Sequence, residues 1–181
     1  FFNVQPISFI FIGDKCFPAD KYAYCFIEMK DGVETYKIYQ PFSENYKWIN
    51  NHNNSVWSGW TQLPPKGEDL IITKSTKDLM CITEICNIPA VSLQSENVIP
   101  KREVVQQLKE RFNTIYLLYD NDFDASQNWG RLFADKLSKE FGFIDIYIKN
   151  EFKCKDFSDL VKSIGCDKAK DVLLNHTMLP F

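Results

Sequence analysis

Residues 114–125 read TIYLLYDNDFDA, an apolar run that ends in three carboxylates at alternate positions. The apolar part, residues 115–119, is typical of a strand buried on both faces of a sheet. Ligand sites in open α/β sheets lie beyond the carboxyl ends of such strands. Asp120, Asp122 and Asp124 repel one another unless a cation lies among them, and hard oxygen ligands suit Mg²⁺ or Mn²⁺. The stretch predicts a metal site, although a polar turn that caps the next helix is an equally good interpretation.

The composition is that of a packed globular protein, because 45% of the 181 residues are hydrophobic and 15% are aromatic. The net charge of −3 argues against a stand-alone DNA-binding module, but not against an enzyme that holds its substrate through metal ions. The apolar start, residues 1–13, contains Pro6 and is too short to span a bilayer. We expect a buried strand there, and a cytoplasmic protein with no membrane partner. The six cysteines form no zinc motif.

The first part of the chain, residues 1–66, is expected to be a β-rich N-terminal subdomain. Residues 22–30 and 33–40 are aromatic and β-branched, and Asp31-Gly32 between them is a strong hairpin signal. The LPPKG run that follows ends this part of the chain and is typical of a boundary between subdomains.

The second part, residues 67–181, alternates predicted strands and helices, which indicates a mostly parallel sheet flanked by helices. Strands are expected at residues 70–73, 89–93, 115–119 and 143–148. Helices are expected at residues 76–86, 101–112, 127–142, 157–164 and 168–174. Four of them follow a polar residue that is expected to cap the helix: Ser75, Ser126, Asp156 and Asp167.

Polar clusters follow all four predicted strands. They are TKSTKD at residues 73–78, QSEN at 94–97, DNDFD at 120–124 and KDFSD at 155–159. In a parallel sheet these strand ends share one edge, so the clusters are expected to converge. The first cluster lies at a strand-to-helix turn, where free N–H groups and lysines favour an anion, although solvated lysines are the simpler interpretation.

Lysines and aromatic residues alternate in the β-rich part. Lys37, Tyr39, Tyr46, Lys47 and Trp48 could stack the bases of a single strand, or simply form the covered face of a small sheet. Motifs of the P-loop, of dinucleotide binding, of zinc proteases and of the serine hydrolase elbow are absent from the sequence.

Four runs together resemble the Toprim domain, the metal-binding fold of bacterial-type primases, topoisomerases and some nucleases. They are LIITKSTKDLM at residues 70–80, PAVSLQSEN at 89–97, IYLLYDNDFDA at 115–125 and KDFSDLV at 155–161. KIYQPFSENYKWINN at residues 37–51 is similar to the polymerase domain of phage-type DNA primases, in which a β-rich subdomain precedes Toprim. The resemblance covers about residues 36–165 and implies a Toprim-like α/β fold.

The resemblance implies a set of site residues. Asp120 and Asp122 match the family's Asp-x-Asp motif, and Asp78 matches the aspartate after the first strand. The family's glutamate falls at Lys74, which cannot bind a metal while it is protonated. Lys74 would then contact a triphosphate, and Glu96 would supply the missing carboxylate. The full expectation is a catalytic set of Asp120, Asp122, Glu96, Lys74 and Asp78, metal ligands Asp120, Asp122 and Asp124, and phosphate-binding Lys37, Lys47, Lys74 and Lys77.

The function implied by this resemblance is a primase-type RNA polymerase core. Such a core makes short RNA primers on a single-stranded DNA template from ribonucleoside triphosphates, with Mg²⁺ or Mn²⁺. A replicative helicase, or zinc-ribbon and helicase domains outside these residues, are the implied partners. A Toprim nuclease and a catalytically silent nucleic-acid-binding domain are the alternatives.

Overall fold

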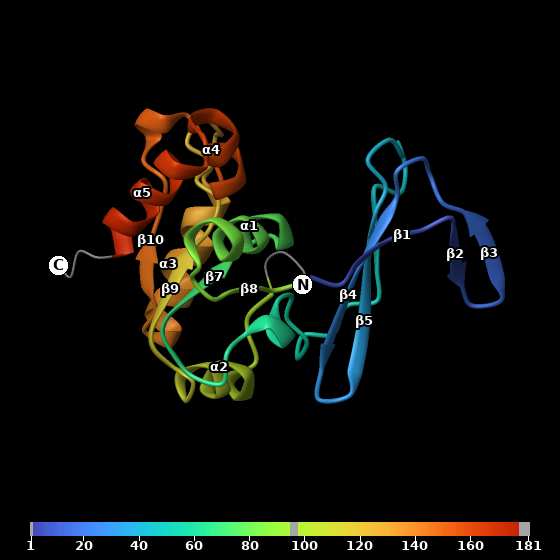
Figure 1. Cartoon of the computed structure of the whole chain (residues 1–181), viewed down its shortest axis with the longest axis horizontal. Coiled ribbons are helices and arrows are strands. Elements are labelled where there is room, and N and C mark those ends of the chain that lie inside the picture. Colours follow the sequence, from blue (N-terminus) through green and yellow to red (C-terminus); the bar gives the residue numbers. More distant parts are fainter. Residues whose placement is uncertain (1, 95–97, 178–181) are drawn as a thin grey trace.

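The computed structural model describes residues 2–94 and 98–177, and its centre is a parallel four-stranded sheet with strand order β10-β9-β7-β8 (Figure 1). The strands are β7 (Gly67–Thr73), β8 (Ala90–Ser92), β9 (Phe112–Leu118) and β10 (Ile144–Ile146). All four expected strands are present. Their carboxyl ends lie at one edge of the sheet, because every pairing is parallel.

Helices cover both faces of this sheet because successive residues of its strands point in opposite directions. Leu70 and Ile72 of β7 enter one core, and Ile71 between them enters the other. The first core is closed by α2 (Arg102–Lys109) and α3 (Trp129–Phe141). The second is closed by α1 (Thr76–Cys81), the π-helical turn η2 (Ile82–Cys86), α4 (Phe157–Ile164) and α5 (Cys166–Thr177).

Several predicted helix ends were wrong. The helix expected at residues 101–112 ends at Lys109, because Phe112 pairs with Gly67 in the sheet and is buried. Asn128, not Ser126, caps α3, since its side chain accepts from the backbone N–H of Arg131. Asp167 lies inside the first turn of α5 and does not cap it.

The N-terminal part forms an antiparallel sheet with strand order β1-β4-β5-β6. Its strands are β1 (Val4–Pro6), β4 (Tyr24–Lys30), β5 (Val33–Tyr39) and β6 (Trp48–Asn50). The predicted hairpin is confirmed, with Asp31 at φ 51° and Gly32 at φ 77°. Two consecutive residues with positive φ make the tight turn whose twist matches that of paired strands.

The expectation of a buried N-terminal strand was wrong. Residues 9–12 form β2 (Phe9–Ile12), which pairs only with β3 (Lys15–Pro18) in a hairpin at one end of the molecule (Figure 1). Phe9 is 61% exposed and Phe11 is 74% exposed, whereas Ile10 between them is buried, so the hairpin is covered on one face only. None of the helices in the described part of the chain has the length and apolar character needed to cross a membrane.

The antiparallel sheet contacts the α/β part through residues on either side of the LPPKG run. Glu28 of β4 accepts from the backbone N–H of Gly59 at 3.2 Å, and Gln94 donates to Thr35 of β5 at 2.6 Å. Trp57 precedes the predicted boundary but is fully buried in the core of the α/β part. The division at residues 66 and 67 remains a prediction.

Candidate metal and nucleotide site

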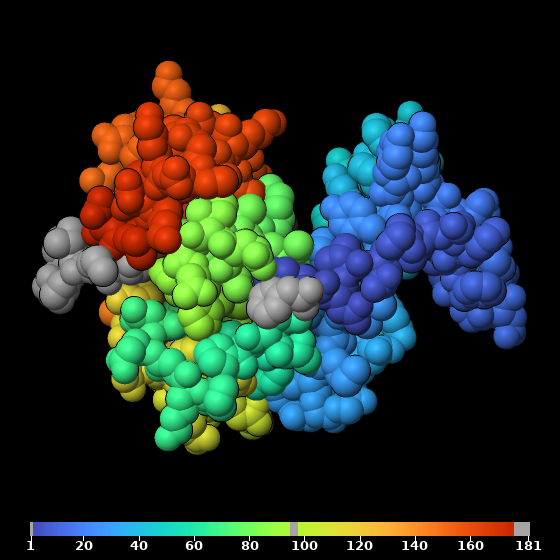
Figure 2. Space-filling model, viewed as in Figure 1, coloured from blue at the N-terminus to red at the C-terminus, as the bar shows by residue number. Residues whose placement is uncertain are grey.

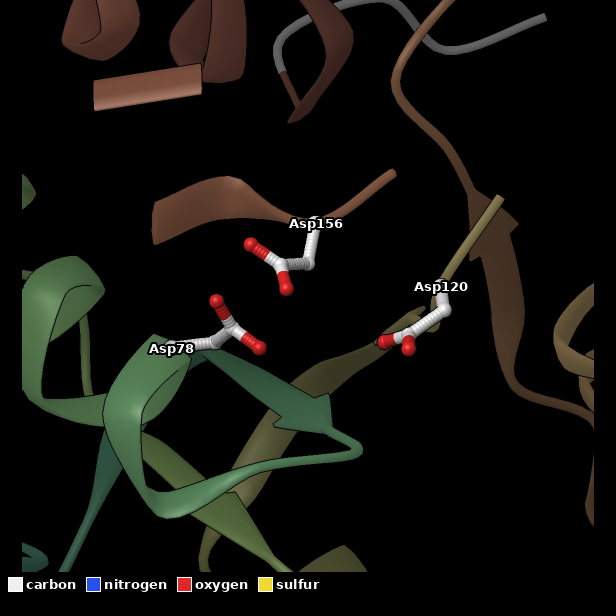
Figure 3. A group of neighbouring side chains, drawn as sticks. All are labelled: Asp78, Asp120 and Asp156. Carbon is white, nitrogen blue, oxygen red and sulfur yellow. The ribbon is translucent and has the colours of Figure 1, made fainter. Parts of the chain in front are cut away.

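Three aspartates meet at the carboxyl edge of the parallel sheet. Asp78 lies in α1, Asp120 follows β9, and Asp156 precedes α4 (Figure 3). One carboxylate oxygen from each residue lies within 4.8 Å of the other two. The sequence places these residues far apart, and the shared strand edge brings them together.

Asp78 is oriented by the first turn of α1. Ser75 caps this helix, because its hydroxyl accepts from the backbone N–H of Asp78 at 3.1 Å, and it donates to Asp78 Oδ2 at 2.5 Å. The other oxygen of Asp78 accepts from the backbone N–H of Ser158 at 2.9 Å. Burial raises the pKa of Asp78, and Asp156 raises it further. A buried acid held in this way favours a nearby cation.

Asp156 caps α4, as predicted, and also faces the other acids. Its Oδ1 accepts from the backbone N–H of Asp159 at 2.8 Å and from the hydroxyl of Ser158 at 2.7 Å. Its Oδ2 lies 3.4 Å from the ammonium of Lys77. The side chain therefore has one oxygen fixed by the helix and one facing the cluster.

Two close contacts fix the chain around Asp120. A Cβ on Gly130 would lie 2.1 Å from the carbonyl oxygen of Asp120, so only glycine allows α3 to approach β9 this closely. Asn121 is buried and its backbone N–H donates to the carbonyl oxygen of Lys155 at 2.7 Å. Its side chain donates to the carbonyl oxygen of Ile148 at 2.7 Å. The backbone bond to Lys155 holds the segments that carry Asp120 and Asp156 against each other, and the other contacts fix the turn after β9.

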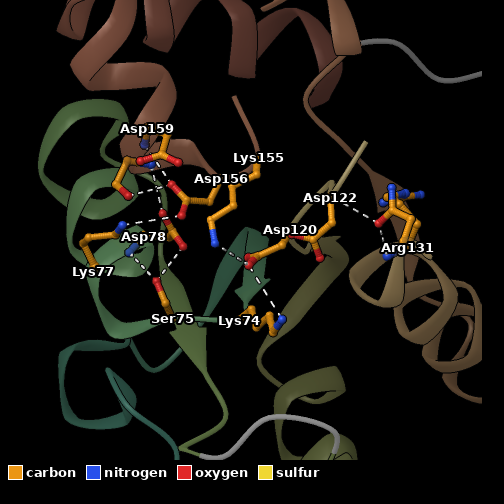
Figure 4. Close-up of polar contacts among 12 residues, drawn as sticks. Lys74, Ser75, Lys77, Asp78, Asp120, Asp122, Arg131, Lys155, Asp156 and Asp159 are labelled. Carbon is orange, nitrogen blue, oxygen red and sulfur yellow. Dashed lines mark hydrogen bonds and ion pairs between the residues drawn. The ribbon is translucent and has the colours of Figure 1, made fainter. Parts of the chain in front are cut away.

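Lysines surround the Asp120 carboxylate (Figure 4). Lys74 Nζ lies 3.6 Å from Asp120 Oδ2, and Lys155 Nζ lies 3.9 Å from the same oxygen. Burial raises the pKa of Asp120 to about 6, although Lys74 lowers it. The two lysines therefore compensate only part of the cost of burying this charge.

The residues present fit a hard divalent cation. Three carboxylates offer oxygen atoms to one point, and hydrogen bonds from Ser75, Ser158 and Asp159 already hold two of them. Such a donor set is typical of Mg²⁺ and Mn²⁺ and poorly suited to softer metals.

Asp120 and Asp156 line a cavity of about 540 Å³ between the two sheets, and Asp78 is buried next to them. Figure 2 shows the molecule hollowed between the antiparallel sheet, in blue, and helices α1 and α4. One wall carries polar residues of the α/β part and the other carries side chains of β4, β5 and β6. The lining residues are Tyr24, Phe26, Lys37, Tyr39, Trp48, Asn50, Lys74, Ser75, Thr76, Lys77, Gln94, Asp120, Lys155 and Asp156.

The antiparallel wall of the cavity is aromatic. The rings of Tyr39 and Trp48 have their centroids 4.4 Å apart, and Tyr24 lies 5.4 Å from Tyr39. Lys37 Nζ lies 4.9 Å from the centroid of the half-exposed Trp48 ring. Lys47 is exposed over Tyr39 and is not among the residues that line the cavity.

The structure brings together some of the predicted site residues and not others. Asp78, Asp120, Lys74, Lys77 and Lys37 border the acids or the cavity. Asp122 is half-buried and Asp124 is exposed, and neither belongs to the carboxylate cluster found among residues 2–94 and 98–177. Glu96 lies outside the described residues, so its predicted role stays a prediction.

Asp156 was the site residue that the sequence prediction missed. The KDFSD cluster was placed at the correct sheet edge, but Asp156 was interpreted only as a helix cap. Asp156 caps α4 and also belongs to the carboxylate cluster, and its two oxygens have different partners. Asn121 was also missed, because a buried asparagine between two aspartates leaves no pattern that distinguishes it from a turn residue.

Comparison with known proteins identifies the fold. No protein-family model and no curated protein sequence matches this chain. Solved structures do match. The DnaG primase catalytic domain bound to ssDNA is 14% identical with a TM-score of 0.66, and the match covers 93% of this chain and 57% of that one. A DNA primase domain from Pseudomonas aeruginosa is 13% identical with a TM-score of 0.68, with 93% and 56% covered.

The primase fragment of the bacteriophage T7 primase-helicase protein is 16% identical with a TM-score of 0.58, and the match covers 88% of this chain and 65% of that one. The fold is that of a primase catalytic core. The chain spans less than two thirds of the length of these three structures. Because each match includes at least 88% of this chain, the likeness extends beyond the parallel sheet into the N-terminal β region.

Proposed function

We propose that this chain is a primase-type RNA polymerase core that joins ribonucleotides on a single-stranded DNA template. The observation that carries the proposal is a cluster of three carboxylates beside the cavity between the two sheets, of which Asp120 and Asp156 line the cavity together with lysines and an aromatic wall. A nucleotide has the matching parts, since its triphosphate needs cations and its base needs a flat apolar surface.

The carboxylates of Asp78, Asp120 and Asp156 would hold Mg²⁺ or Mn²⁺. A bound ion supplies charge stabilisation at the reacting phosphate and at the leaving pyrophosphate. Asp122 and Asp124 remain candidates for further ligands because they follow Asp120 on the same turn.

The lysines bordering the cavity would bind the phosphate groups. Lys74 and Lys77 flank the start of α1, where free backbone N–H groups also favour anions. Lys37 reaches the cavity from the opposite sheet and donates to the carbonyl oxygen of Gln94 at 3.3 Å. Cations on both walls would hold a polyphosphate chain across the cavity while the acids orient its metal.

A base would stack on the aromatic wall formed by Tyr24, Tyr39 and Trp48. Stacking on such rings tolerates every base, so it suits a template or an incoming nucleotide of any sequence. The net charge of −3 leaves little long-range attraction for DNA. We therefore expect template recognition to rely on further domains or on a helicase partner.

The alternative of a Toprim nuclease uses the same kind of metal site. The N-terminal antiparallel sheet favours the primase proposal, because it supplies the aromatic wall and one cation of the cavity. A nuclease domain has no need of this second wall.

The test is metal-dependent primer synthesis. The purified chain is incubated with single-stranded DNA, ribonucleoside triphosphates and Mn²⁺, and labelled products are resolved by length. Wild-type protein should extend short RNA products, and Asp120→Asn and Asp156→Asn should reduce them to background. Cutting of the template in place of synthesis would establish the nuclease instead.

Two aspartate substitutions complete this experiment. Asp14→Asn changes an aspartate in the exposed β2–β3 turn and should leave synthesis unchanged. Asp124→Asn separates the two possible ligand sets, because Asp124 lies outside the carboxylate cluster. Loss of synthesis in Asp124→Asn would support the ligand set predicted from the sequence.

A further inference from the structure

Lys74 lies next to Asp120, the least buried carboxylate of the candidate metal site. Its side chain is only 17% exposed, and its ammonium lies 3.6 Å from Asp120 Oδ2. Lys74 follows β7 and Asp120 follows β9, and these strands are neighbours with Thr73 paired to Leu118. The pairing of β7 with β9 therefore holds the Lys74 ammonium next to the Asp120 carboxylate.

Lys74 and the other two acids approach Asp120 from different directions. In Figure 4, Asp78 and Asp156 lie on one side of the Asp120 carboxylate, and Lys74 reaches it from the other. Asp120 is thus positioned as a bridge between two cation positions. The three carboxylates surround the first position, and the lysine ammonium fills the second.

Charge balance points the same way. The three carboxylates carry a formal charge of −3, and Lys74, Lys77 and Lys155, which pair with Asp120 or Asp156, carry +3. A second divalent ion beside Lys74 would meet an ammonium at close range in a partly buried site, where repulsion is weakly screened.

We propose that this site takes a single divalent cation, and that the Lys74 ammonium permanently occupies the place of a second one. The inference rests on the proposed metal site of the polymerase function. Lys74 would act as a positioning residue: it would hold Asp120 toward the one ion and supply a fixed positive charge on the phosphate side.

The inference predicts the metal stoichiometry. Calorimetric titration of the metal-free chain with Mn²⁺ alone should give one ion per chain, and electron paramagnetic resonance should show an isolated Mn²⁺. Lys74→Glu replaces the ammonium with a carboxylate, so it should bind a second Mn²⁺ and show coupling between two ions. Lys74→Met removes the charge without adding a ligand and should stay at one ion.

Lys155→Glu is the matched control. It makes the same charge reversal beside the same Asp120 oxygen, but the side chain of Lys155 is 52% exposed and reaches Asp120 from the side of Asp78 and Asp156, opposite to Lys74 (Figure 4). It should stay at one ion. Thermal unfolding verifies that each variant is folded before titration.

The outcomes distinguish a failure of the single-ion inference from a failure of the proposed metal site. Two Mn²⁺ ions in the wild type, or a second ion in both glutamate variants, would overturn the inference while leaving the metal site intact. A folded Lys74→Glu variant that still binds one ion would also overturn it. A wild type that binds no Mn²⁺ would overturn the metal site of the proposed function, and the inference with it.

Discussion

The backbone N–H of Asn121 donates to the carbonyl oxygen of Lys155 at 2.7 Å, and this bond ties the turn after β9 to the segment before α4. Each of these two residues is the direct neighbour of a clustered carboxylate, Asp120 in one case and Asp156 in the other. The distance between the two acids therefore depends on a backbone contact, which the Asn121 side chain reinforces from the buried side.

Asn121→Ala tests this arrangement. It removes a buried side chain that donates to the carbonyl oxygen of Ile148 and accepts from Asn128, both at 2.7 Å. Leaving these partners unsatisfied should lower the free energy of unfolding by about 1–3 kcal/mol. It should also weaken Mn²⁺ binding, because the turn that carries Asp120 loses its side-chain anchors to Ile148 and Asn128. Urea unfolding and calorimetric titration measure the two effects.

Asn113→Ala is its control. This exposed asparagine also donates a side-chain hydrogen bond, to Glu68 at 2.7 Å, but on the surface. Its removal should change stability by no more than about 0.5 kcal/mol and leave Mn²⁺ binding unaltered. Equal effects of the two substitutions would contradict the positioning role of Asn121.

Gly130→Ala sets two effects against each other. Helix propensity alone predicts a gain of about 1 kcal/mol from alanine in α3. The new Cβ would instead lie 2.1 Å from the carbonyl oxygen of Asp120, and relieving that clash should cost about 1–3 kcal/mol. We expect a net loss of stability in urea unfolding, together with weaker Mn²⁺ binding as Asp120 moves.

Gly142→Asn, at the end of the same helix, provides the comparison. Gly142 has φ 71°, a conformation that asparagine tolerates, and a Cβ there meets nothing within 4 Å. The change should stay within about 1 kcal/mol and spare metal binding. A stabilised Gly130→Ala variant would show that α3 can withdraw from β9 at no cost.

Glu28 should make stability depend on pH. Burial raises its pKa to about 7, although the Gly59 N–H and Ser58 lower it. In the unfolded chain this carboxyl ionises near pH 4.5, so between pH 4.5 and 7 the folded state holds more protons than the unfolded state. The contribution of Glu28 to the free energy of unfolding is therefore greatest below pH 4.5, falls as the pH rises to about 7, and stays constant above pH 7.

Glu28→Gln should remove that fall. The neutral variant should be more stable than the wild type at pH 8, by up to about 3 kcal/mol, with little difference at pH 4. Thermal unfolding at a series of pH values measures this. Glu44→Gln, in an exposed loop, should leave the pH profile of the wild type in place. A Glu28→Gln profile that still falls between pH 4.5 and 7 would refute the assignment.

Trp48→Ala tests the aromatic wall. If a base stacks on Trp48, truncation should weaken binding of a labelled single-stranded oligonucleotide by about 1–3 kcal/mol at fixed salt. Fluorescence anisotropy measures the dissociation constant, and Trp48→Phe should retain much of the affinity. Tyr46→Ala removes a neighbouring exposed ring that does not line the cavity and should have no effect. Equal losses in both alanine variants would argue against stacking in the cavity.

Local patterns in the sequence predicted a large part of the fold. The alternation of strands and helices, the Asp31-Gly32 turn, and the caps Ser75 and Asp156 are all present in the structure. Each depends on residues a few positions apart, so the sequence carries it directly. The N-terminal strand was mispredicted because its burial requires a second layer, which its own residues cannot reveal.

The sequence by itself determined that acids and lysines follow the strands of a parallel sheet, and therefore that a charged site forms at one edge. Only the tertiary structure decided which of them meet. The cluster joins Asp120 to Asp78 and Asp156, and the strand order β9-β7 places Lys74 beside Asp120. The physical reason is that strand order and contacts such as Asn121 to Lys155 join distant segments, and spacing along the chain does not record them.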